Sequence, residues 1–419
     1  MKWDEQKARE AEESFQMSDG EIRAVSEAFR AEIGRGLRHE TSSLKLLPSY
    51  LGMPTGKEEG EYITLDFGGT NVRADRVRLL GDGRYEMAAR VAKPLLVPGK
   101  YNHLGGGETA AGLFAFLAEI IDSLVAGDRE TPYRLGHTFS FPSEQTSLGD
   151  ARLMHWTKEL SVSDVEGEWV NRRLEDALTK RGLTNIRPVA ILNDTVAALL
   201  AAGYERGDIA VGSIYATGFN ICYLEDFGGE KPSMVLNLEA GGFDKVETNG
   251  LDRALDAASE QPGTQRFEKM VSGRYLGELF ALAMGSVVGE RLPAVSGKDI
   301  ASVAEGTDTE LLARMTGEEF SDEQAAEAVA VARAIVRRSA RLVAAAYVGV
   351  LRHRAGQGKS VPAQTVAVEG SFFANVPLAR ATLRDTMRAL LGDGEGPAEI
   401  ADVVNGASLG AAIAAAMAK

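Results

Sequence analysis

The spacing of apolar residues changes from helical to extended within the first hundred positions of this 419-residue chain. Residues 11–17 and 21–37 place apolar side chains three and four positions apart, which predicts amphipathic helices. An extended, proline-marked segment, LPSYLGMPTG, follows them. Three runs, ITLDFG, VRADRVRLL and YEMAARVA, then have the pattern of strands, and the glycines at 81 and 83 predict a hairpin turn between the last two. The pattern therefore predicts helices followed by an antiparallel meander.

Helical and extended patterns alternate over the next part of the chain. The expected elements are a helix at 112–125, a strand at 133–141, a helix at 165–182 and a strand at 187–193. This alternation is typical of a layered α/β sheet, and we place the end of a first domain near Leu192.

The remainder of the chain repeats the same order of elements. Strands are expected at 209–217, 220–226, 234–239, 364–371 and 398–404, and helices at 251–259, 266–284 and 325–353 and between the last two strands. The polar segment 296–310 is expected to be a loop with a short helix. The alanine-rich segment 406–419 is expected to be a helix that crosses back onto the first domain. Two copies of one topology predict a duplicated architecture with a cleft between its halves.

Composition narrows the class of protein. A chain of this length, with 44% hydrophobic residues, suits two or three domains with real cores. A formal charge of −14 offers no electrostatic footprint for nucleic acid or an anionic membrane, and no apolar run reaches membrane-spanning length. The acid-rich N-terminus lacks the pattern of a secretion signal. One cysteine, Cys222, excludes an internal disulfide and is expected to be a buried small hydrophobe. We expect the cytosol as the compartment.

Two glycine turns lie at matching positions of the two halves. In ITLDFGGTN, residues 63–71, a strand ends on an acid, turns on two glycines and continues into a second strand. Such a turn admits phosphate oxygens close to the backbone, but it is also an ordinary way to join two strands. The second turn is ATGFN, residues 216–220. A nucleotide held from both sides would explain the pairing, and so would simple duplication.

The segment LNDTVAALLAAGY places an acid where a strand meets a helix. Asp194 has two interpretations there. As an N-cap it would satisfy the first free N–H groups of the helix. As a catalytic base at a sheet edge facing the cleft, it would take a proton from a substrate hydroxyl.

Taken together, these motifs resemble those of the hexokinase family. LDFGGTN is similar to its first phosphate motif, FSFPSEQTSL and WTKEL to its sugar-binding segment, LNDTVAALL to its catalytic strand and helix, and ATGFNICYLE to its second phosphate turn. NLEAGGF, PGTQRFEKMVSGRYLGEL and VEGSF resemble its remaining sugar and nucleoside segments. The motifs come in family order from about Leu47 to the end, and only 286–325 matches loosely. Ala240 stands where the family usually has an aromatic residue, which predicts a looser pocket wall.

The resemblance implies a fold and a domain division. The fold is the actin-like ATPase (ribonuclease H-like) α/β fold, with two lobes that each hold a mixed five-stranded sheet flanked by helices, and an active-site cleft between them. The small domain would be 61–192, with a C-terminal helix at 405–419 packing back on it. The large domain would be 1–60 and 193–404.

The resemblance also assigns roles to side chains. Asp194 would be the general base for the sugar 6-hydroxyl, and Lys158 would offset charge on the transferring phosphoryl group. Lysine is by default a solvated surface charge, so this role for Lys158 depends on its place after Trp156 and Thr157. Besides Asp194 and Lys158, the implied sugar ligands are Ser140, Thr157, Asn193, Asn220, Glu239 and Glu268.

The nucleotide side of the site follows from the two glycine turns. Asp66 would orient hydrated Mg²⁺ through water, and the glycines would admit the phosphates of ATP. The implied nucleotide-binding residues are Asp66, Gly68, Gly69, Thr70, Asn71, Thr217, Gly218, Gly370 and Ser371. The helix through Arg338 and Ser339 would lie near the nucleoside.

The implied function is ATP-dependent phosphorylation of a hexose at the 6-hydroxyl, the first step of glycolysis. D-Glucose is the expected substrate, and mannose, fructose and glucosamine stay open. One alternative is a non-catalytic hexose sensor, since the same fold can bind without turnover. Retention of both Asp194 and Lys158 argues against it. Another alternative, an actin-like polymer or chaperone ATPase, would need no polar sugar-binding set.

Overall fold

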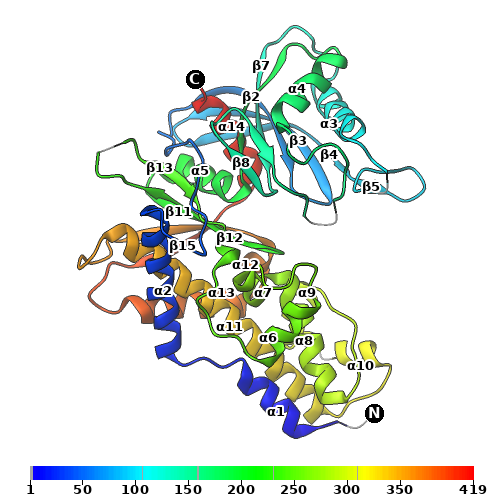
Figure 1. The fold of residues 1–419 in the computed structure, drawn as a ribbon, viewed down its shortest axis with the longest axis vertical. Helices are drawn as coiled ribbons and strands as arrows, with labels where there is room; N and C mark the ends of the chain where they lie inside the picture. The colour runs from blue at the N-terminus through cyan, green and yellow to red at the C-terminus, as the bar shows by residue number, and fades with distance from the viewer. Residues whose placement is uncertain (1–2, 106, 158–159, 230, 309) are drawn as a thin grey trace. The chain divides into compact units, whose positions relative to one another are not determined.

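The computed structural model describes residues 3–105, 107–157, 160–229, 231–308 and 310–419 (Figure 1). Its contacts divide the chain into two compact units, which are described separately. The helical unit is Met1–Leu46, Ser213–Ile221 and Leu238–Asp402, and the sheet unit is Leu47–Gly212, Cys222–Asn237 and Val403–Lys419. The predicted small domain, 61–192, lies within the sheet unit, as does the segment 405–419.

The sheet unit contains a mixed five-stranded sheet in the order β10-β7-β2-β3-β4. Its strands are β2 (Glu59–Phe67), β3 (Asn71–Gly81), β4 (Arg84–Pro94), β7 (Tyr133–Phe139) and β10 (Ile186–Leu192). β2, β3 and β4 form the predicted antiparallel meander, whereas β7 pairs in parallel with both β2 and β10. Asp82 and Gly83 both have positive φ, +51° and +71°, and this matches the tight hairpin turn expected there. The short strand pairs β5 (Leu96–Val97) with β6 (Tyr101–Asn102) and β8 (Ser143–Gln145) with β9 (Ala151–Leu153) lie outside this sheet.

Helices pack on both faces of this sheet. α3 (Ala110–Val125) contacts β3 and β4, and α4 (Val170–Lys180) contacts β10. α5 (Asp194–Arg206) and α14 (Gly406–Met417) pack against each other, and α14 contacts β2 and β7. Gly136 of β7 contacts α14, and the next residue, His137, bonds to Asn171 of α4. Because successive residues of a strand face opposite sides of the sheet, α14 and α4 cover opposite faces. A Cβ on Gly136 would lie 1.9 Å from the Ala411 carbonyl oxygen, so only glycine lets α14 approach this closely.

The helical unit is built around one long helix, α11. α11 (Asp322–Ala355) contacts helices from both ends of the sequence, including α2 and α13 (Figure 1). The other helices are α1 (Glu5–Ser14), α2 (Asp19–Leu37), α6 (Gly250–Ala258), α7 (Arg266–Val271), α8 (Gly273–Val288), α9 (Gly297–Glu305), α10 (Leu311–Thr316), α12 (Ser371–Asn375) and α13 (Pro377–Leu391), with a 3₁₀ turn, η1 (Ala240–Gly242). Ser296 and Asp299 form a capping box at α9, the short helix expected within 296–310.

The second sheet has six strands, one more than expected. Its order is β1-β13-β12-β11-β14-β15, and the chain passes from one unit to the other within β11 and again within β12. Its strands are β1 (Leu47–Pro48), β11 (Ile209–Tyr215), β12 (Phe219–Glu225), β13 (Met234–Asn237), β14 (Gln364–Glu369) and β15 (Ala398–Asp402). The additional strand is β1, whose two residues pair with β13 and are too few to give a periodic signal.

Two predicted helices have different bounds in the structure. The helix expected at 165–182 begins only at Val170, because Gly167 adopts a left-handed φ of +82° that interrupts a helix. The helix expected at 266–284 is two helices, α7 and α8, separated by Ser272 in an extended conformation. The Gly273 N–H after this break donates to the Ala216 carbonyl at 2.8 Å, so a tertiary hydrogen bond replaces a helical one.

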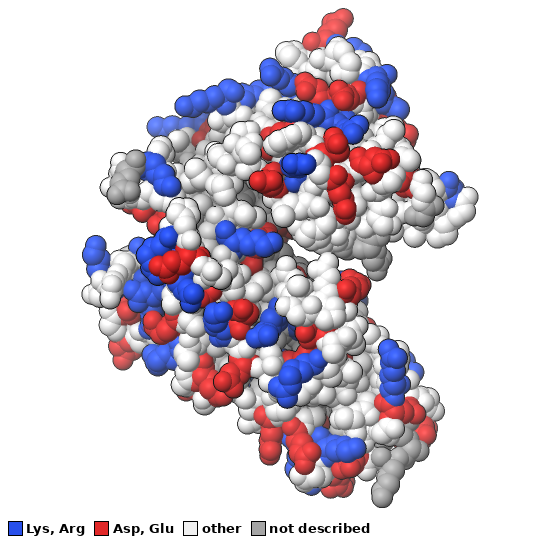
Figure 2. Space-filling model, in the orientation of Figure 1, with Lys and Arg blue, Asp and Glu red and all other residues white. Residues whose placement is uncertain are grey.

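Cys222 is buried, as expected for a small hydrophobe. Its thiol donates to the Thr195 carbonyl at 3.1 Å, and burial raises its pKa well above the ordinary value. Within the described residues, no helix is long and apolar enough to cross a membrane, and no three His, Cys, Asp or Glu side chains form a metal-binding group. Acidic and basic side chains are interspersed over the face of the molecule shown in Figure 2.

We predict that His137 makes the sheet unit acid-sensitive. Complete burial lowers the pKa of His137 to about 4, and no described residue bonds its Nε2. The unfolded chain, with a histidine pKa near 6.5, therefore binds more protons than the folded chain between about pH 6.5 and 4. Stability should fall by about 3 kcal/mol as the pH drops through this window. His137→Gln should flatten that slope in urea unfolding, and the exposed-site control His155→Gln should keep it. An equal slope in all three proteins would contradict the prediction.

Candidate active site

Three groups of predicted site residues lie at one edge of the five-stranded sheet. The parallel strands β2, β7 and β10 all end at this edge, and ligands of α/β proteins commonly bind beyond the carboxyl ends of such strands. Asp66 lies at the end of β2, Ser140 directly follows β7, and Asn193 and Asp194 directly follow β10. The sheet topology thus collects residues that are far apart in the sequence.

The first glycine turn joins β2 to β3 beside Ser140. Gly69 has a φ of +153°, a conformation that favours glycine. The Ser140 N–H donates to the Phe67 carbonyl at 3.2 Å, and the Ser140 hydroxyl oxygen lies 3.5 Å from where a Cβ on Gly68 would stand. Thr70 and Asn71 are exposed. The turn is therefore a strand connection, and its role as a phosphate site stays a prediction.

Asp66 faces a basic partner that the sequence analysis did not single out. Arg73 lies opposite Asp66 in the register of β2 and β3, and its Nη1 is 3.9 Å from the Asp66 Oδ2. The hairpin turn could have revealed this pairing, because it fixes which residues oppose each other. Mg²⁺ usually keeps several waters and takes only one or two protein carboxylates, so the single half-buried Asp66 fits a hydrated ion.

The structure tests the N-cap interpretation of Asp194. Asn193 is the N-cap of α5, and its Oδ1 accepts from the Thr195 N–H at 2.9 Å. Asp194 is the first residue of the helix, so the N-cap interpretation of Asp194 is wrong. Its Oδ1 accepts from the Thr195 N–H at 2.8 Å, and no other described residue donates a hydrogen bond to its Oδ2. A carboxylate held through one oxygen can receive a proton on the other.

The segment that carries Thr157 is held by Trp156. The Trp156 N–H donates to Glu166 at 2.8 Å, and its indole donates to the Val162 carbonyl at 2.9 Å. Thr157 is half-buried next to it. Lys158, the predicted partner of the transferring phosphoryl group, lies outside the described residues.

In the helical unit, the second glycine turn is fixed against α8. The Gly273 and Arg274 N–H groups donate to the Ala216 and Thr217 carbonyls at 2.8 and 3.2 Å. Thr217 is exposed, and a Cβ on Gly218 would stand 3.0 Å from Glu268 Oε1. The predicted phosphate turn and a predicted sugar ligand are therefore neighbours in this unit.

The three predicted sugar ligands of the helical unit lie close together. Glu268 on α7 accepts through Oε1 from the Phe219 N–H at 3.1 Å. Asn220 Oδ1 accepts from the Ala240 N–H at 3.0 Å, which places Asn220 beside Glu239. Glu239 has a φ of +51°, uncommon for a residue with a side chain and frequent at functional sites. The buried residue Ala240 and the following glycines make the sharp turn η1 after it.

Gly370 and Ser371 lie beside the second glycine turn. Gly370 has a φ of +152°, and a Cβ there would stand 2.2 Å from the Tyr215 carbonyl oxygen at the end of β11. Ser371 is the first residue of α12 and is exposed. The predicted nucleoside segment and the predicted second phosphate turn are therefore neighbours in the fold.

Arg338 and Ser339 of α11 hold the core of the helical unit. The Arg338 guanidinium makes a bidentate ion pair with Asp252 at 2.7 and 2.8 Å, and both side chains are buried. Ser339 donates to the Val271 carbonyl and bonds the Tyr215 hydroxyl, each at 2.7 Å. These buried contacts give both side chains a structural role, and the expectation that this helix lies near the nucleoside stays a prediction.

We predict that Gly370→Ala destabilises the helical unit. The new methyl group would clash with the Tyr215 carbonyl in addition to straining the backbone, at a cost of about 1–3 kcal/mol for each effect. The control Gly392→Ala has a similar backbone cost, since its φ is +76°, but open space around its Cβ. Urea unfolding should show the larger loss for Gly370→Ala. Equal losses would mean that the close approach is relaxed at no cost.

Comparisons with known proteins agree over nearly the whole chain. Two family models, both described as hexokinase, match residues 7–204 and 210–417. Hexokinase-1 of Oryza sativa subsp. japonica is 35% identical over 441 residues, which cover 94% of this chain and 86% of that protein. Hexokinase-7 of the same plant is 34% identical, and the match covers 94% of this chain and 92% of that protein. A structure of hexokinase from Schistosoma mansoni, complexed with glucose, superposes with a TM-score of 0.85 at 29% identity over 98% of each chain.

Proposed function

Because this chain belongs to the hexokinase family, and is therefore a hexose kinase that uses ATP, we propose that D-glucose is its hexose and the 6-hydroxyl its acceptor group. The reaction would give hexose 6-phosphate and ADP, the first step of glycolysis. The glucose bound to the Schistosoma mansoni hexokinase supports this choice of sugar.

The placement of Asp194 is the observation that carries the proposal. It follows a parallel strand, at the edge where ligands of this fold class bind, and a second residue, Asn193, caps the helix. Asp194 is therefore not the N-cap, which is the structural role that most often explains an acid at the start of a helix. A hexose sensor, which binds the sugar without phosphorylating it, would not need this carboxylate as a base.

In the proposed mechanism, the oxygen of the sugar 6-hydroxyl attacks the γ-phosphorus of ATP. Asp194 takes the proton of this hydroxyl during the attack. The new oxygen–phosphorus bond forms while the bond to the β-phosphate oxygen breaks, and ADP leaves. Lys158 would offset the charge that develops on the phosphoryl group. Mg²⁺, oriented by Asp66 through water, would supply further neutralisation of the phosphates.

The other residues hold the two substrates in position. Glu239 and Glu268 accept hydrogen bonds from sugar hydroxyls, and charged acceptors make the strongest and most directional of these bonds. Amide and hydroxyl groups complete the hexose ligands, which are Ser140, Thr157, Asn193 and Asn220. The glycine turns and Gly370 with Ser371 admit the nucleotide. Orientation of this kind contributes to rate because the reacting atoms meet in line.

A coupled assay tests the proposal directly. The purified chain is mixed with ATP, Mg²⁺ and each of glucose, mannose, fructose and glucosamine, and ADP formation is followed. We expect turnover with glucose, with kcat/KM higher than for the other sugars. Saturable glucose binding without any ADP would instead identify a hexose sensor. Faster turnover of another hexose would replace glucose as the substrate.

A further inference from the structure

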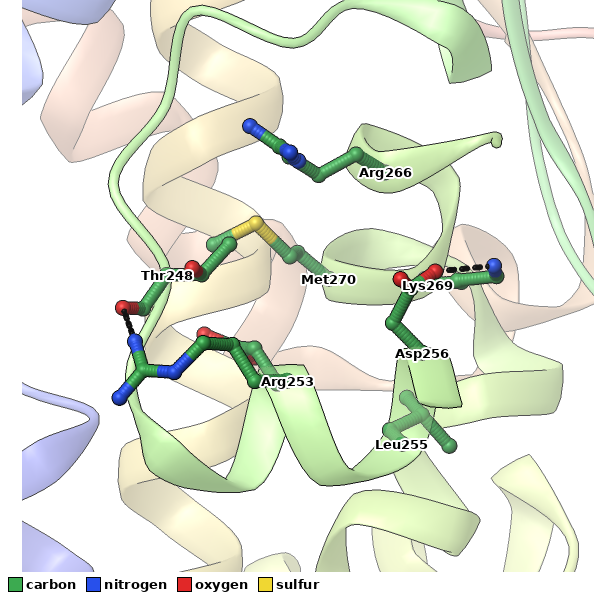
Figure 3. Close-up of a pocket in the computed structure, with 8 residues that line it drawn as sticks. Thr248, Arg253, Leu255, Asp256, Arg266, Lys269 and Met270 are labelled. Carbon is green, nitrogen blue, oxygen red and sulfur yellow. Dashed lines mark hydrogen bonds and ion pairs between the residues drawn. The ribbon is translucent and has the colours of Figure 1, made fainter. Parts of the chain in front are cut away.

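A pocket lies between α6 and α7, away from the residues assigned to hexose and nucleotide. Its volume is about 80 Å³, which is small for a drug-sized ligand and suits a small ion or a compact polar group. The polar side chains that shape it include Thr248, Arg253 and Arg266, and Met270 contributes an apolar wall. Figure 3 shows Arg266 on one side of Thr248 and Met270, and Arg253 on the other.

The pocket and the predicted hexose ligand Glu268 lie on opposite faces of α7. Residues 266, 269 and 270 are spaced three and four apart, so they share one face of the helix. Glu268 lies about half a turn away and accepts from Phe219 on the other side. A molecule in this pocket would therefore not touch the sugar through Glu268.

The acids of the pocket are already neutralised. Asp252 forms the buried bidentate pair with Arg338 at 2.7 and 2.8 Å. Lys269, which is 4% exposed, donates to Asp256 at 2.5 Å and to the Gln261 carbonyl at 2.8 Å. The Lys269 hydrogen bond holds the pKa of Asp256 below its usual range, so this carboxylate stays ionised and paired. Neither acid leaves an excess negative charge in the pocket.

The two arginines at the rim are exposed, and each is oriented by a backbone carbonyl. Arg253 Nη1 donates to the Thr248 carbonyl at 2.6 Å, and Arg266 Nη1 donates to the Asp244 carbonyl at 3.1 Å. Carbonyls orient a guanidinium without cancelling its charge, and each guanidinium has five N–H donors. Across the described ranges, no carboxylate lies within ion-pair distance of either one. The pocket therefore carries two positive charges in a chain whose net charge is −14.

We propose that this pocket binds a phosphate dianion, either inorganic phosphate or the phosphate group of a small phosphomonoester. Arginine forks match the oxygens of phosphate in bidentate pairs, and two forks around one hollow suit a doubly charged tetrahedral group. The Thr248 side chain offers a further hydroxyl donor, and Met270 and Leu255 can cover the carbon skeleton of an ester. The site is independent of the hexose and nucleotide residues.

Titration calorimetry on the full chain tests this site. Sodium phosphate and glycerol 3-phosphate are titrated separately at constant ionic strength, with glucose and a non-hydrolysable ATP analogue present so that the glycine turns are filled. We expect saturable binding of one ion per chain. Arg253→Gln and Arg266→Gln should each weaken it about tenfold or more, since each removes charged hydrogen bonds. The exposed control Arg291→Gln should leave the affinity within about twofold.

The outcomes separate the possibilities. Tighter binding of glycerol 3-phosphate than of phosphate would identify an organic phosphomonoester as the ligand class, and equal binding would identify phosphate itself. Absence of saturable heat with both probes, or equal weakening by all three variants, would overturn the site. Thermal unfolding of the variants checks that the fold is retained. Loss of binding in the Arg253 and Arg266 variants reports on this pocket alone, because neither residue belongs to the proposed hexose and nucleotide sites, so the result is separate from the proposed kinase activity.

Discussion

Asp194→Asn should lower kcat by about 10²–10⁴-fold while leaving the fold intact. The change keeps the size of the side chain and the acceptor that receives the Thr195 N–H, so α5 and its Asn193 cap are preserved. It removes the oxygen that would take the proton from the sugar 6-hydroxyl. The loss should appear in kcat more than in the affinity for glucose, because the proton is transferred only in the transition state.

The matched control is Asp176→Asn on the exposed face of α4. It removes the same charge from the same unit and should retain normal turnover. Calorimetry with glucose shows whether Asp194→Asn still binds the sugar, and thermal unfolding shows whether it is folded. Near-normal kcat in a folded Asp194→Asn protein would rule out Asp194 as the general base.

Glu268→Gln and Glu239→Gln should each weaken glucose binding strongly. A carboxylate that accepts from two neighbouring hydroxyls loses about 1.5–3 kcal/mol for each charged hydrogen bond, roughly 10- to 100-fold in affinity per bond. Glutamine is the informative replacement at Glu268, because its amide oxygen can still accept from the Phe219 N–H at 3.1 Å. The loss can then be attributed to the sugar and not to a disturbed α7.

Calorimetry with glucose measures this effect, and the exposed Glu247→Gln serves as the control in the same unit. The double variant shows whether both carboxylates contact one sugar. Losses that add indicate independent hydroxyl contacts, and a smaller combined loss indicates coupled ones. Unchanged affinity in either single variant would remove that glutamate from the proposed hexose site.

The order of elements could be predicted from the sequence alone. The alternation of apolar and polar residues in 63–80 and the glycines at 81 and 83 were enough to predict the β2–β3–β4 meander, because hairpins depend on neighbouring residues. The helix α11 could likewise be predicted from the local spacing of its apolar residues. The family resemblance rested on short motifs around Asp66, Asp194 and Glu268, whose order alone made it specific. These features need no knowledge of distant contacts.

Other features depended on contacts between distant parts of the chain. Helical periodicity runs through 266–284, yet the chain breaks at Ser272, where the Gly273 N–H bonds to Ala216. Arg338 forms a buried ion pair with Asp252, 86 positions away in the chain. No local pattern carries information about a partner that far along the chain.

The sequence by itself determined which residue types this protein places at strand ends and glycine turns, and through them its family. Only the tertiary structure decided which partner each one has: it made Asn193, and not Asp194, the N-cap of α5. It also set two exposed arginines around one pocket and paired Asp252 and Asp256 with Arg338 and Lys269. The physical reason is that a polar side chain's role depends on which partner satisfies it, and partners are chosen by packing.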